Sequence, residues 1–238
     1  NDTLVSENWL ENLLKPFDKD KKIGLVGPIS NSVGNEQRVN IDGLNEKNYI
    51  EKSKEYTTLN KDVVCETQRL GFFCVAIKRE LIDKIGLLDE KFGIGMFGDD
   101  DYCMRSIKAG YKNVFVEDSF VYHKGSVSFK KLTTEAYQEI FQKNKAYFLQ
   151  KHAVEWSLSD IAFSYWNKFN DNLQEFSKNK NEASIDRITK RFDNFKHLLY
   201  QIREIEIKKS NITNSVHSSI VTNTKWQIRL NNLKNELI

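Results

Sequence analysis

The chain has few cysteines and no long apolar run, and these two absences exclude several classes of protein. Its three cysteines, Cys65, Cys74 and Cys103, are odd in number and form no Cys-x-x-Cys pair. We therefore expect reduced thiols rather than a disulfide framework, as in a reducing compartment, and hence a cytoplasmic protein. No apolar run reaches the ~18 residues that a membrane-spanning helix needs.

A strong charge of either sign is also lacking. The 36 Lys and Arg residues nearly balance 33 Asp and Glu residues, and the net charge of +3 is too small to indicate a nucleic-acid partner. A length of 238 residues suits one domain, or one domain with an appendage. Because the chain begins with Asn1 rather than Met, we expect a fragment or a processed product of a longer protein.

Glycine is absent after residue 155, and this shift in composition divides the chain. In residues 1–155, short apolar runs alternate with amphipathic stretches. The runs predict strands over 22–28, 71–77, 113–116 and 119–122, the first ended by a Gly-Pro turn. Helices are predicted over 78–85, 101–108 and 134–151. Strands mixed with helices predict an α/β architecture, with a mixed sheet flanked by helices.

Residues 156–238 are expected to form a helical extension with two apolar stripes. The first stripe, with heptad spacing, contains Ile185, Ile188, Phe192, Phe195, Leu199 and Ile202, and the second contains Trp226, Leu230, Leu233 and Leu237. A polar turn or linker is expected over 210–215. The stripes fit a helical hairpin folded onto its own domain, self-association into a homo-oligomer, or docking onto a partner. Nine basic against five acidic residues over 176–209 suit either a solvated helix face or peripheral contact with an anionic membrane.

The most informative motif is Gly-Met-Phe-Gly-Asp-Asp-Asp-Tyr-Cys-Met-Arg over residues 95–105. Its glycines let the backbone approach a ligand closely, and a helix starting among Asp99, Asp100 and Asp101 holds the acids at its positive end. That placement suits a carboxylate that must stay ionised and accept a proton. One alternative is an N-cap formed by Asp99 or Asp100. Another is a small cation-binding regulatory domain, although the spacing of a calcium loop is absent.

A second motif places His123 at the end of an apolar strand, before the Gly/Ser-rich stretch 125–128. A neutral imidazole at this position suits a metal ligand, and Lys124 with the loop amides suits phosphate oxygens. A surface histidine in a turn is the alternative. Asp2 could likewise hold a divalent cation against a diphosphate, or it could be solvated.

Together these motifs resemble a family 2 glycosyltransferase of the GT-A type, of the bacterial rhamnosyltransferase-like kind. The resemblance covers residues 1 to about 150 and rests on the order of its elements. These are Asn1-Asp2-Thr3, Gly27-Pro28-Ile29-Ser30-Asn31 with Gly34 to Gln37, Gly71 to Arg79, Ile85 to Phe92, Asp99 to Tyr111, and His123 to Phe129.

The resemblance implies an inverting transfer of sugar from a UDP-, dTDP- or GDP-sugar to a glycan or lipid-linked acceptor in cell-surface polysaccharide synthesis. The family's base falls on Asp99. Gly98 stands where the family has Glu, which leaves Asp100 as a rival base.

The same resemblance implies that Asp2 and His123 hold Mg²⁺ or Mn²⁺. Asn31 and Gly71 would lie near the donor sugar, with Lys124 facing phosphate. Asp101 would cap the helix or pair with Arg105.

The family's nucleotide-binding half, which precedes the Asp-x-Asp segment, has no counterpart in this sequence. We therefore expect exposed strand edges and weak or absent activity for these residues alone. The competing interpretation is a non-catalytic interaction or scaffold module, in which a glycosyltransferase remnant carries a partner-binding helical tail.

Overall fold

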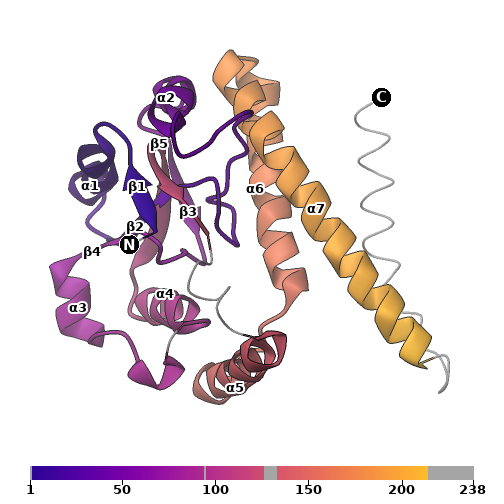
Figure 1. Ribbon diagram of the computed structural model, residues 1–238. Coiled ribbons are helices and arrows are strands. Elements are labelled where there is room, and N and C mark those ends of the chain that lie inside the picture. Colours follow the sequence, from indigo (N-terminus) through magenta and orange to yellow (C-terminus); the bar gives the residue numbers. More distant parts are fainter. Residues whose placement is uncertain (1, 94, 126–132, 214–238) are drawn as a thin grey trace. The chain divides into compact units, whose positions relative to one another are not determined.

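The computed structural model describes residues 2–93, 95–125 and 133–213 (Figure 1). Backbone contacts group the chain into two compact units, Asn1–Leu198 and Leu199–Ile238. The elements in chain order are β1 (Thr3–Val5), α1 (Trp9–Lys19), β2 (Ile23–Ile29), α2 (Tyr49–Leu59), β3 (Val64–Thr67), β4 (Ala76–Ile77), α3 (Arg79–Ile85), the 3₁₀ turn η1 (Glu90–Phe92), α4 (Gly98–Lys108), β5 (Lys112–His123), α5 (Thr134–His152), α6 (Leu158–Asn179) and α7 (Glu182–Thr213).

A mixed sheet with helices packed against it forms the first unit, which confirms the predicted α/β class. The strand order is β1-β5-β2-β4, and β3 also pairs with β5. Strand β5 runs parallel to β2 and antiparallel to β1 and β3, while β2 pairs with β4 antiparallel. Helix α1 packs against β2 and β5, and α2 packs against β5. The long strand β5 therefore links nearly all of the sheet.

Strand β5 was predicted as two strands, over 113–116 and 119–122, and that prediction is wrong. The acids Glu117 and Asp118 break the apolar pattern, yet both are buried in a continuous strand. Glu117 accepts hydrogen bonds from Tyr56 and Arg191, and Asp118 accepts one from the Asp62 amide. Because buried acids are tolerated when they have such partners, the strand continues through them.

Two other strand boundaries differ from the sequence prediction. Gly27 and Pro28 lie inside β2 rather than in a turn after it, since the strand continues to Ile29. The strand expected over 71–77 is reduced to Ala76 and Ile77. Its first residue, Gly71, donates its amide to the Gln37 side chain instead of to a neighbouring strand. Side-chain hydrogen bonds of this kind compete with sheet ladders.

The three helices predicted before residue 155 are confirmed, with α4 beginning at Gly98 rather than Asp101, whereas α1 and α2 were not predicted. Helix α3 ends before Gly86, which has a φ of 79° that favours glycine. Helix α4 ends before Gly110, with a φ of 87°, and α5 spans the predicted range within a residue. No helix among the described residues is both long enough and apolar enough to cross a membrane.

Helices α6 and α7 form a hairpin, whereas the sequence predicted one between the two apolar stripes, with its turn over 210–215. The first stripe packs partly on α6, where the Phe169 ring lies 5.9 Å from Phe192 and 6.0 Å from Phe195 between centroids. The second stripe lies outside the described residues. Residues 210–213, expected in a linker, belong to α7.

The face of α7 that is buried in the first unit is largely polar. Its buried residues include Ser184, Arg187, Arg191 and Asn194, whereas Ile185 and Phe192 of the stripe are 51% and 44% exposed. Phe195 of the stripe and Leu198 are also buried, so the heptad pattern identifies only part of the docking face. The domain boundary predicted near residue 155 remains a prediction. Backbone contacts group α6 and the start of α7 with the first unit.

Candidate functional site

The pairing of β1 with β5 brings Asp2 and His123 together. Thr3 lies opposite His123 in the register, so Asp2 sits at the strand end beside the imidazole. The Asp2 Oδ2 to His123 Nε2 distance is 3.2 Å, with side chains 34% and 18% exposed. The expected proximity of these two residues is confirmed, and ligands remain able to reach them.

The surroundings of His123 orient its ring. Its Nδ1 lies 2.6 Å from the Ser32 carbonyl oxygen, and its ring stacks on Phe73 with centroids 5.4 Å apart. A carbonyl only accepts hydrogen bonds, so Nδ1 carries a proton. In the neutral imidazole, Nε2 then presents a lone pair toward the Asp2 carboxylate. Two hydrogen-bond acceptors 3.2 Å apart require a proton or a cation between them. Histidines that bind a metal through one ring nitrogen typically donate the N–H of the other to a carbonyl or carboxylate.

Asn31 fastens the loop after β2 to the same strand end. Its side-chain amide donates to the His123 carbonyl at 3.1 Å, and its Oδ1 accepts from the His123 amide at 2.9 Å. The Lys124 amide donates to the Asp2 carbonyl at 2.9 Å, but its ammonium pairs with Glu46 at 2.6 Å. The sequence-predicted residues Asn31 and Lys124 are thus both adjacent to the pair, with the Lys124 charge directed to Glu46.

Gly71 lies where another part of the loop after β2 approaches. Its amide donates to Gln37 Oε1 at 2.8 Å, and a Cβ at this position would lie 2.6 Å from Val33 Cγ2. The loop therefore leaves no room for a side chain at Gly71. Asn35 of the same loop donates to the Arg69 carbonyl and to Gln37 Oε1. Residues 30–40, here called the β2 loop, thus contact both His123 and the segment 69–71.

The acid run occupies the first turn of α4. The helix begins at Gly98 after Phe97, and no side chain caps it, so the expected N-cap by Asp99 or Asp100 is not observed. The Asp99 carboxylate instead accepts from the Asp100 amide at 3.0 Å. Arg69 Nε lies 3.4 Å from Asp100 Oδ1. This ion pair links the acid run to the segment that contains Gly71.

Burial dominates the protonation of these two acids. Loss of hydration raises the pKa of Asp99 above its usual value. Loss of hydration and the neighbouring Asp99 charge raise the pKa of Asp100 to about 7, against the opposing effect of Arg69. Carboxyl groups held in this way suit proton transfer near neutral pH.

Asp101 has a different role from its two neighbours. It is fully buried and accepts hydrogen bonds from Arg105 at 2.9 Å, Lys151 at 2.7 Å and His152 at 2.7 Å. Burial raises the pKa of Asp101, but the bonds from Lys151, His152 and Arg105 outweigh it, and the pKa is lowered. The predicted pairing with Arg105 is confirmed, and Asp101 joins α4 to α5.

Three residues that sequence reasoning did not assign complete the arrangement. Ser32 orients His123, Gln37 holds Gly71, and Arg69 pairs with Asp100. Gln37 belongs to the Gly34–Gln37 element of the motif series, so the sequence pointed to this segment without giving Gln37 a role. A single Arg or Ser in a loop gives none, because its partners are distant in sequence.

The part of the chain that the structure describes contains no complete metal site. Among residues 2–93, 95–125 and 133–213, no group of three or more His, Cys, Asp or Glu side chains is arranged to hold an ion. Asp2 and His123 would therefore supply two ligands, and the remaining ones would come from solvent or a bound diphosphate. The carboxylate suits Mg²⁺ or Mn²⁺, whereas the imidazole nitrogen favours a transition metal, so Mn²⁺ fits this pair better than Mg²⁺.

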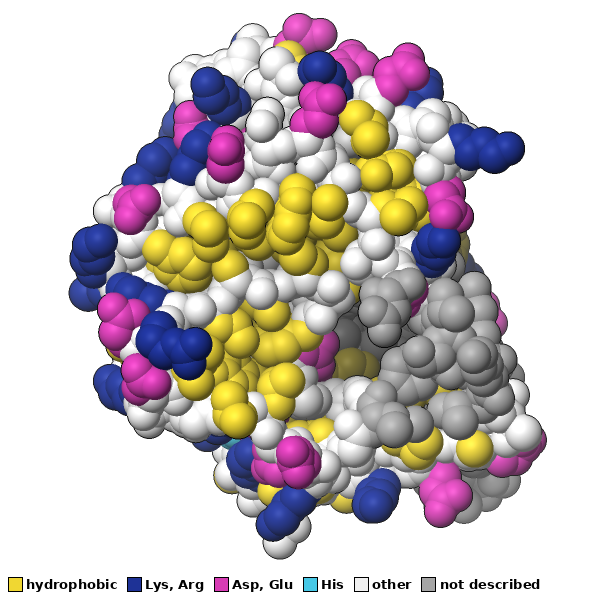
Figure 2. Space-filling view, turned by 60° about the vertical axis from the view of Figure 1, so that its left-hand side comes forward, with side chains coloured by type: hydrophobic (Ala, Val, Ile, Leu, Met, Phe, Trp, Pro, Cys, Tyr) yellow, Lys and Arg dark blue, Asp and Glu magenta, His cyan; other side chains and the backbone are white. Residues whose placement is uncertain are grey.

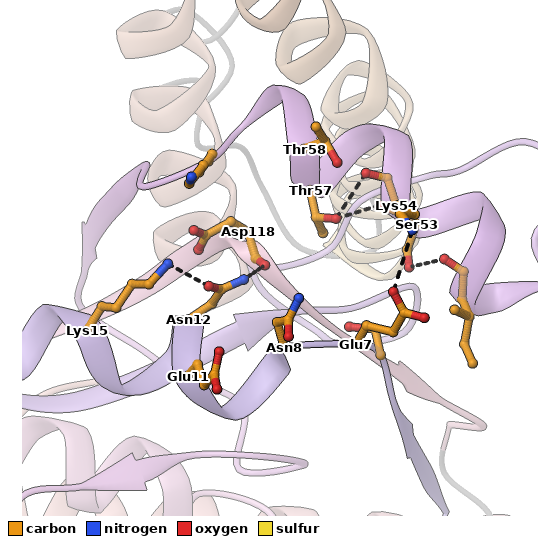
Figure 3. Close-up of a pocket in the computed structure, with 13 residues that line it drawn as sticks. Glu7, Asn8, Glu11, Asn12, Lys15, Ser53, Lys54, Thr57, Thr58 and Asp118 are labelled. Carbon is orange, nitrogen blue, oxygen red and sulfur yellow. Dashed lines mark hydrogen bonds and ion pairs between the residues drawn. The ribbon is translucent and has the colours of Figure 1, made fainter.

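A polar cavity of about 330 Å³ lies elsewhere, between α1 and α2. Figure 3 shows Lys15, Asn12 and Asp118 linked on one side of it, and Glu7 with Lys54 on another. None of the sequence-predicted site residues lines this cavity. The candidate site is therefore located by side-chain geometry around His123 and the acid run, not by cavity volume.

Comparison with known proteins adds one distant relative. No family model matches the chain. The protein named "Uncharacterized protein y4gI" from Sinorhizobium fredii (strain NBRC 101917 / NGR234) is 31% identical over 94 residues. The match covers 40% of this chain and 10% of that protein, so the chain corresponds to a small part of a much longer relative. Its name states no activity.

Proposed function

We propose that this chain is the acceptor-side part of an inverting, nucleotide-sugar-dependent glycosyltransferase of GT-A type. The observation that carries the proposal is the arrangement of His123. Its Nδ1 is committed to the Ser32 carbonyl, while Nε2 faces the Asp2 carboxylate 3.2 Å away. Such an arrangement fits a cation held beside a donor diphosphate. The ordered motif series over residues 1–150 and the acid run in α4 support the same activity.

Each site residue has a proposed role. Asp99 accepts the proton of the acceptor hydroxyl as that oxygen attacks the anomeric carbon, with Asp100 as the rival base. Asp2 and His123 hold Mg²⁺ or Mn²⁺. When bound, the cation stabilises the negative charge of the leaving diphosphate. Asn31 and Gly71 border the donor sugar.

Cell-surface polysaccharide synthesis is the proposed setting, with a glycan or lipid-linked acceptor.

Manganese binding tests the proposed cation site at Asp2 and His123 directly. We expect electron paramagnetic resonance to detect Mn²⁺ bound to the wild-type chain. His123→Gln should lose this binding, since Nε2 no longer provides a ligand.

His152→Gln is the matched control. His152 also faces an aspartate, at 2.7 Å from Asp101, but Lys151 and Arg105 already neutralise that carboxylate. Wild-type protein that binds no Mn²⁺, or His123→Gln that binds it normally, would contradict the proposed cation site.

A non-catalytic interaction module is the second candidate, and exposed apolar residues on α7 favour it. Ile185 and Phe192 on α7 are 51% and 44% exposed. Sugar transfer that depends on Asp99 would exclude this reading. Two contacts argue against cation binding by Asp99, Asp100 and Asp101. Asp101 already accepts hydrogen bonds from Arg105, Lys151 and His152, and Asp100 pairs with Arg69.

A further inference from the structure

The β2 loop lies between the candidate site and the α6–α7 hairpin. On its site side, Asn31 and Ser32 hold His123, and Gln37 holds Gly71. These contacts come from three residues of the loop, Asn31, Ser32 and Gln37. The loop has no strand or helix of its own, so its position depends on what it contacts.

On its other side, the β2 loop is held by side chains and backbone of the hairpin. Tyr165 of α6 donates its hydroxyl to the Asn35 carbonyl. From α7, Arg191 Nε donates to the Glu36 carbonyl at 3.1 Å, and Asn194 donates to the Arg38 carbonyl at 3.2 Å. The Asn40 amide donates back to the Lys190 carbonyl at 3.0 Å. Four loop residues are therefore bonded to two helices.

Most of these bonds are made by buried groups. Tyr165, Arg191 and Asn194 are 6%, 2% and 6% exposed. A loop carbonyl that loses its buried donor is left without a hydrogen bond, which costs free energy and favours a shift of the loop. Because the same loop bonds His123 and Gly71, such a shift would move groups at the candidate site.

We propose that the α6–α7 hairpin positions the cation and donor site through the β2 loop, with Tyr165 and Arg191 as positioning residues. The cation and donor site in this inference rests on the proposed function. The effect of the hairpin on the position of the β2 loop does not depend on it. The hydrogen bonds described above join the hairpin to the loop rather than to His123. Loosening the hairpin would therefore weaken cation binding without removing a ligand.

Tyr165→Phe and Arg191→Lys are the test variants. The first removes only the hydroxyl that bonds Asn35. The second keeps a cation near Glu117 but lacks the Nε–H that bonds Glu36.

Arg187→Lys is the matched control. Arg187 is an equally buried arginine one turn earlier on α7, and it bonds Asn60 and Glu175 rather than the loop.

Amide hydrogen exchange at two reporters outside the hairpin gives the first measurement. The Gly71 amide bonds Gln37, and the His123 amide bonds Asn31. Both should exchange about threefold to tenfold faster in the test variants, the factor expected for one lost hydrogen bond. Amides in the core of β5, which report global unfolding, should change by no more than they do in Arg187→Lys.

Mn²⁺ affinity gives the second measurement. The test variants should bind Mn²⁺ about threefold to tenfold more weakly, at the low end for lost outer-shell support, while Arg187→Lys stays near wild type. Reporter exchange that is unchanged in both test variants, or equally raised in the control, overturns the positioning inference. Wild-type protein that binds no Mn²⁺ overturns the proposed function alone, since hydrogen exchange still decides whether the hairpin positions the loop.

Discussion

Asp99 and Asp100 are chemically identical, but their carboxylates make different contacts. Asp100 lies 3.4 Å from the Arg69 guanidinium, whereas Asp99 accepts from a backbone amide within the first turn of α4. In a preparation that transfers sugar, Asp99→Asn should lower kcat by at least about 100-fold, the lower end of general-base contributions. Donor affinity should change little, because the proposed role of Asp99 is toward the acceptor. Rates measured with saturating donor would check this.

Asp100→Asn is the matched comparison for that variant, since it makes the same chemical change at the neighbouring position. If Asp100→Asn were inactive while Asp99→Asn turned over normally, the roles of the two residues would be exchanged.

The raised pKa of Asp100 predicts a pH effect on stability with a definite sign. Its folded-state pKa of about 7 lies above its usual value of 3.8. Between these values the folded state binds more protons than the unfolded state, so the free energy of unfolding falls as pH rises through this window. Asp100→Asn should therefore gain stability relative to wild type as pH rises from 3.8 to about 7. Urea unfolding at several pH values would measure this difference, and a constant difference would contradict it.

At the scale of elements, α7 is joined to the sheet by a buried ion pair. Arg191 Nη2 lies 2.8 Å from Glu117 Oε2, and Tyr56 bonds both groups. Arg191→Ala should destabilise the fold by about 3–5 kcal/mol, because it leaves Glu117 buried without its counter-charge. Chemical denaturation would measure the loss.

A double variant separates lost packing from lost charge in that experiment. Arg191→Met combined with Glu117→Gln removes both charges and keeps much of the volume, so it should recover a large part of the lost stability. A double variant no more stable than Arg191→Ala would show that the helix contact itself, and not the unpaired acid, accounts for the loss.

The same ion pair shows where sequence reasoning succeeds and where it stops. The glycines after α3 and α4 predicted where these helices end, because the positive φ at Gly86 and Gly110 is a local requirement that favours glycine. Glu117 was taken as an interruption of a strand, since its partner Arg191 lies 74 residues away and no local pattern reveals it. Buried polar pairs across long separations are invisible to periodicity.

The candidate site divides in the same way. Asp2 and His123 were paired correctly through a motif order, and β1–β5 register explains their proximity. Ser32, Gln37 and Arg69 were not assigned, because their roles come from where the β2 loop lies. That position is set in part by Tyr165 and Arg191, which belong to a region without any recognised motif.

At the scale of the whole molecule, exposed apolar surface is the feature that most bears on assembly. Figure 2 shows hydrophobic side chains gathered in broad patches on the face that carries α1, where Leu10 and Leu14 are 47% and 43% exposed. Ile185 and Phe192 of α7 add exposed apolar side chains one heptad apart. Large exposed apolar patches are typical of surfaces that contact other proteins.

We expect the stripe on α7 to drive self-association of the chain. Ile185 and Phe192 present side chains at heptad spacing, which suits packing against the same stripe of a second copy. Wild-type protein should therefore show a mass that rises with concentration in light scattering. Ile185→Ser combined with Phe192→Ser should shift this equilibrium toward the monomer, at a modest cost in stability because both side chains are substantially exposed but the Phe192 ring also packs on Phe169.

Leu87→Ser with Leu88→Ser is the matched control for self-association. These two leucines follow α3 and are 76% and 50% exposed, so the variant removes comparable exposed apolar area without heptad spacing. The control should keep the wild-type concentration dependence. A control that dissociates as readily as the α7 variant would assign association to general surface hydrophobicity, and an α7 variant that associates like wild type would place the contact on another face, such as that of α1.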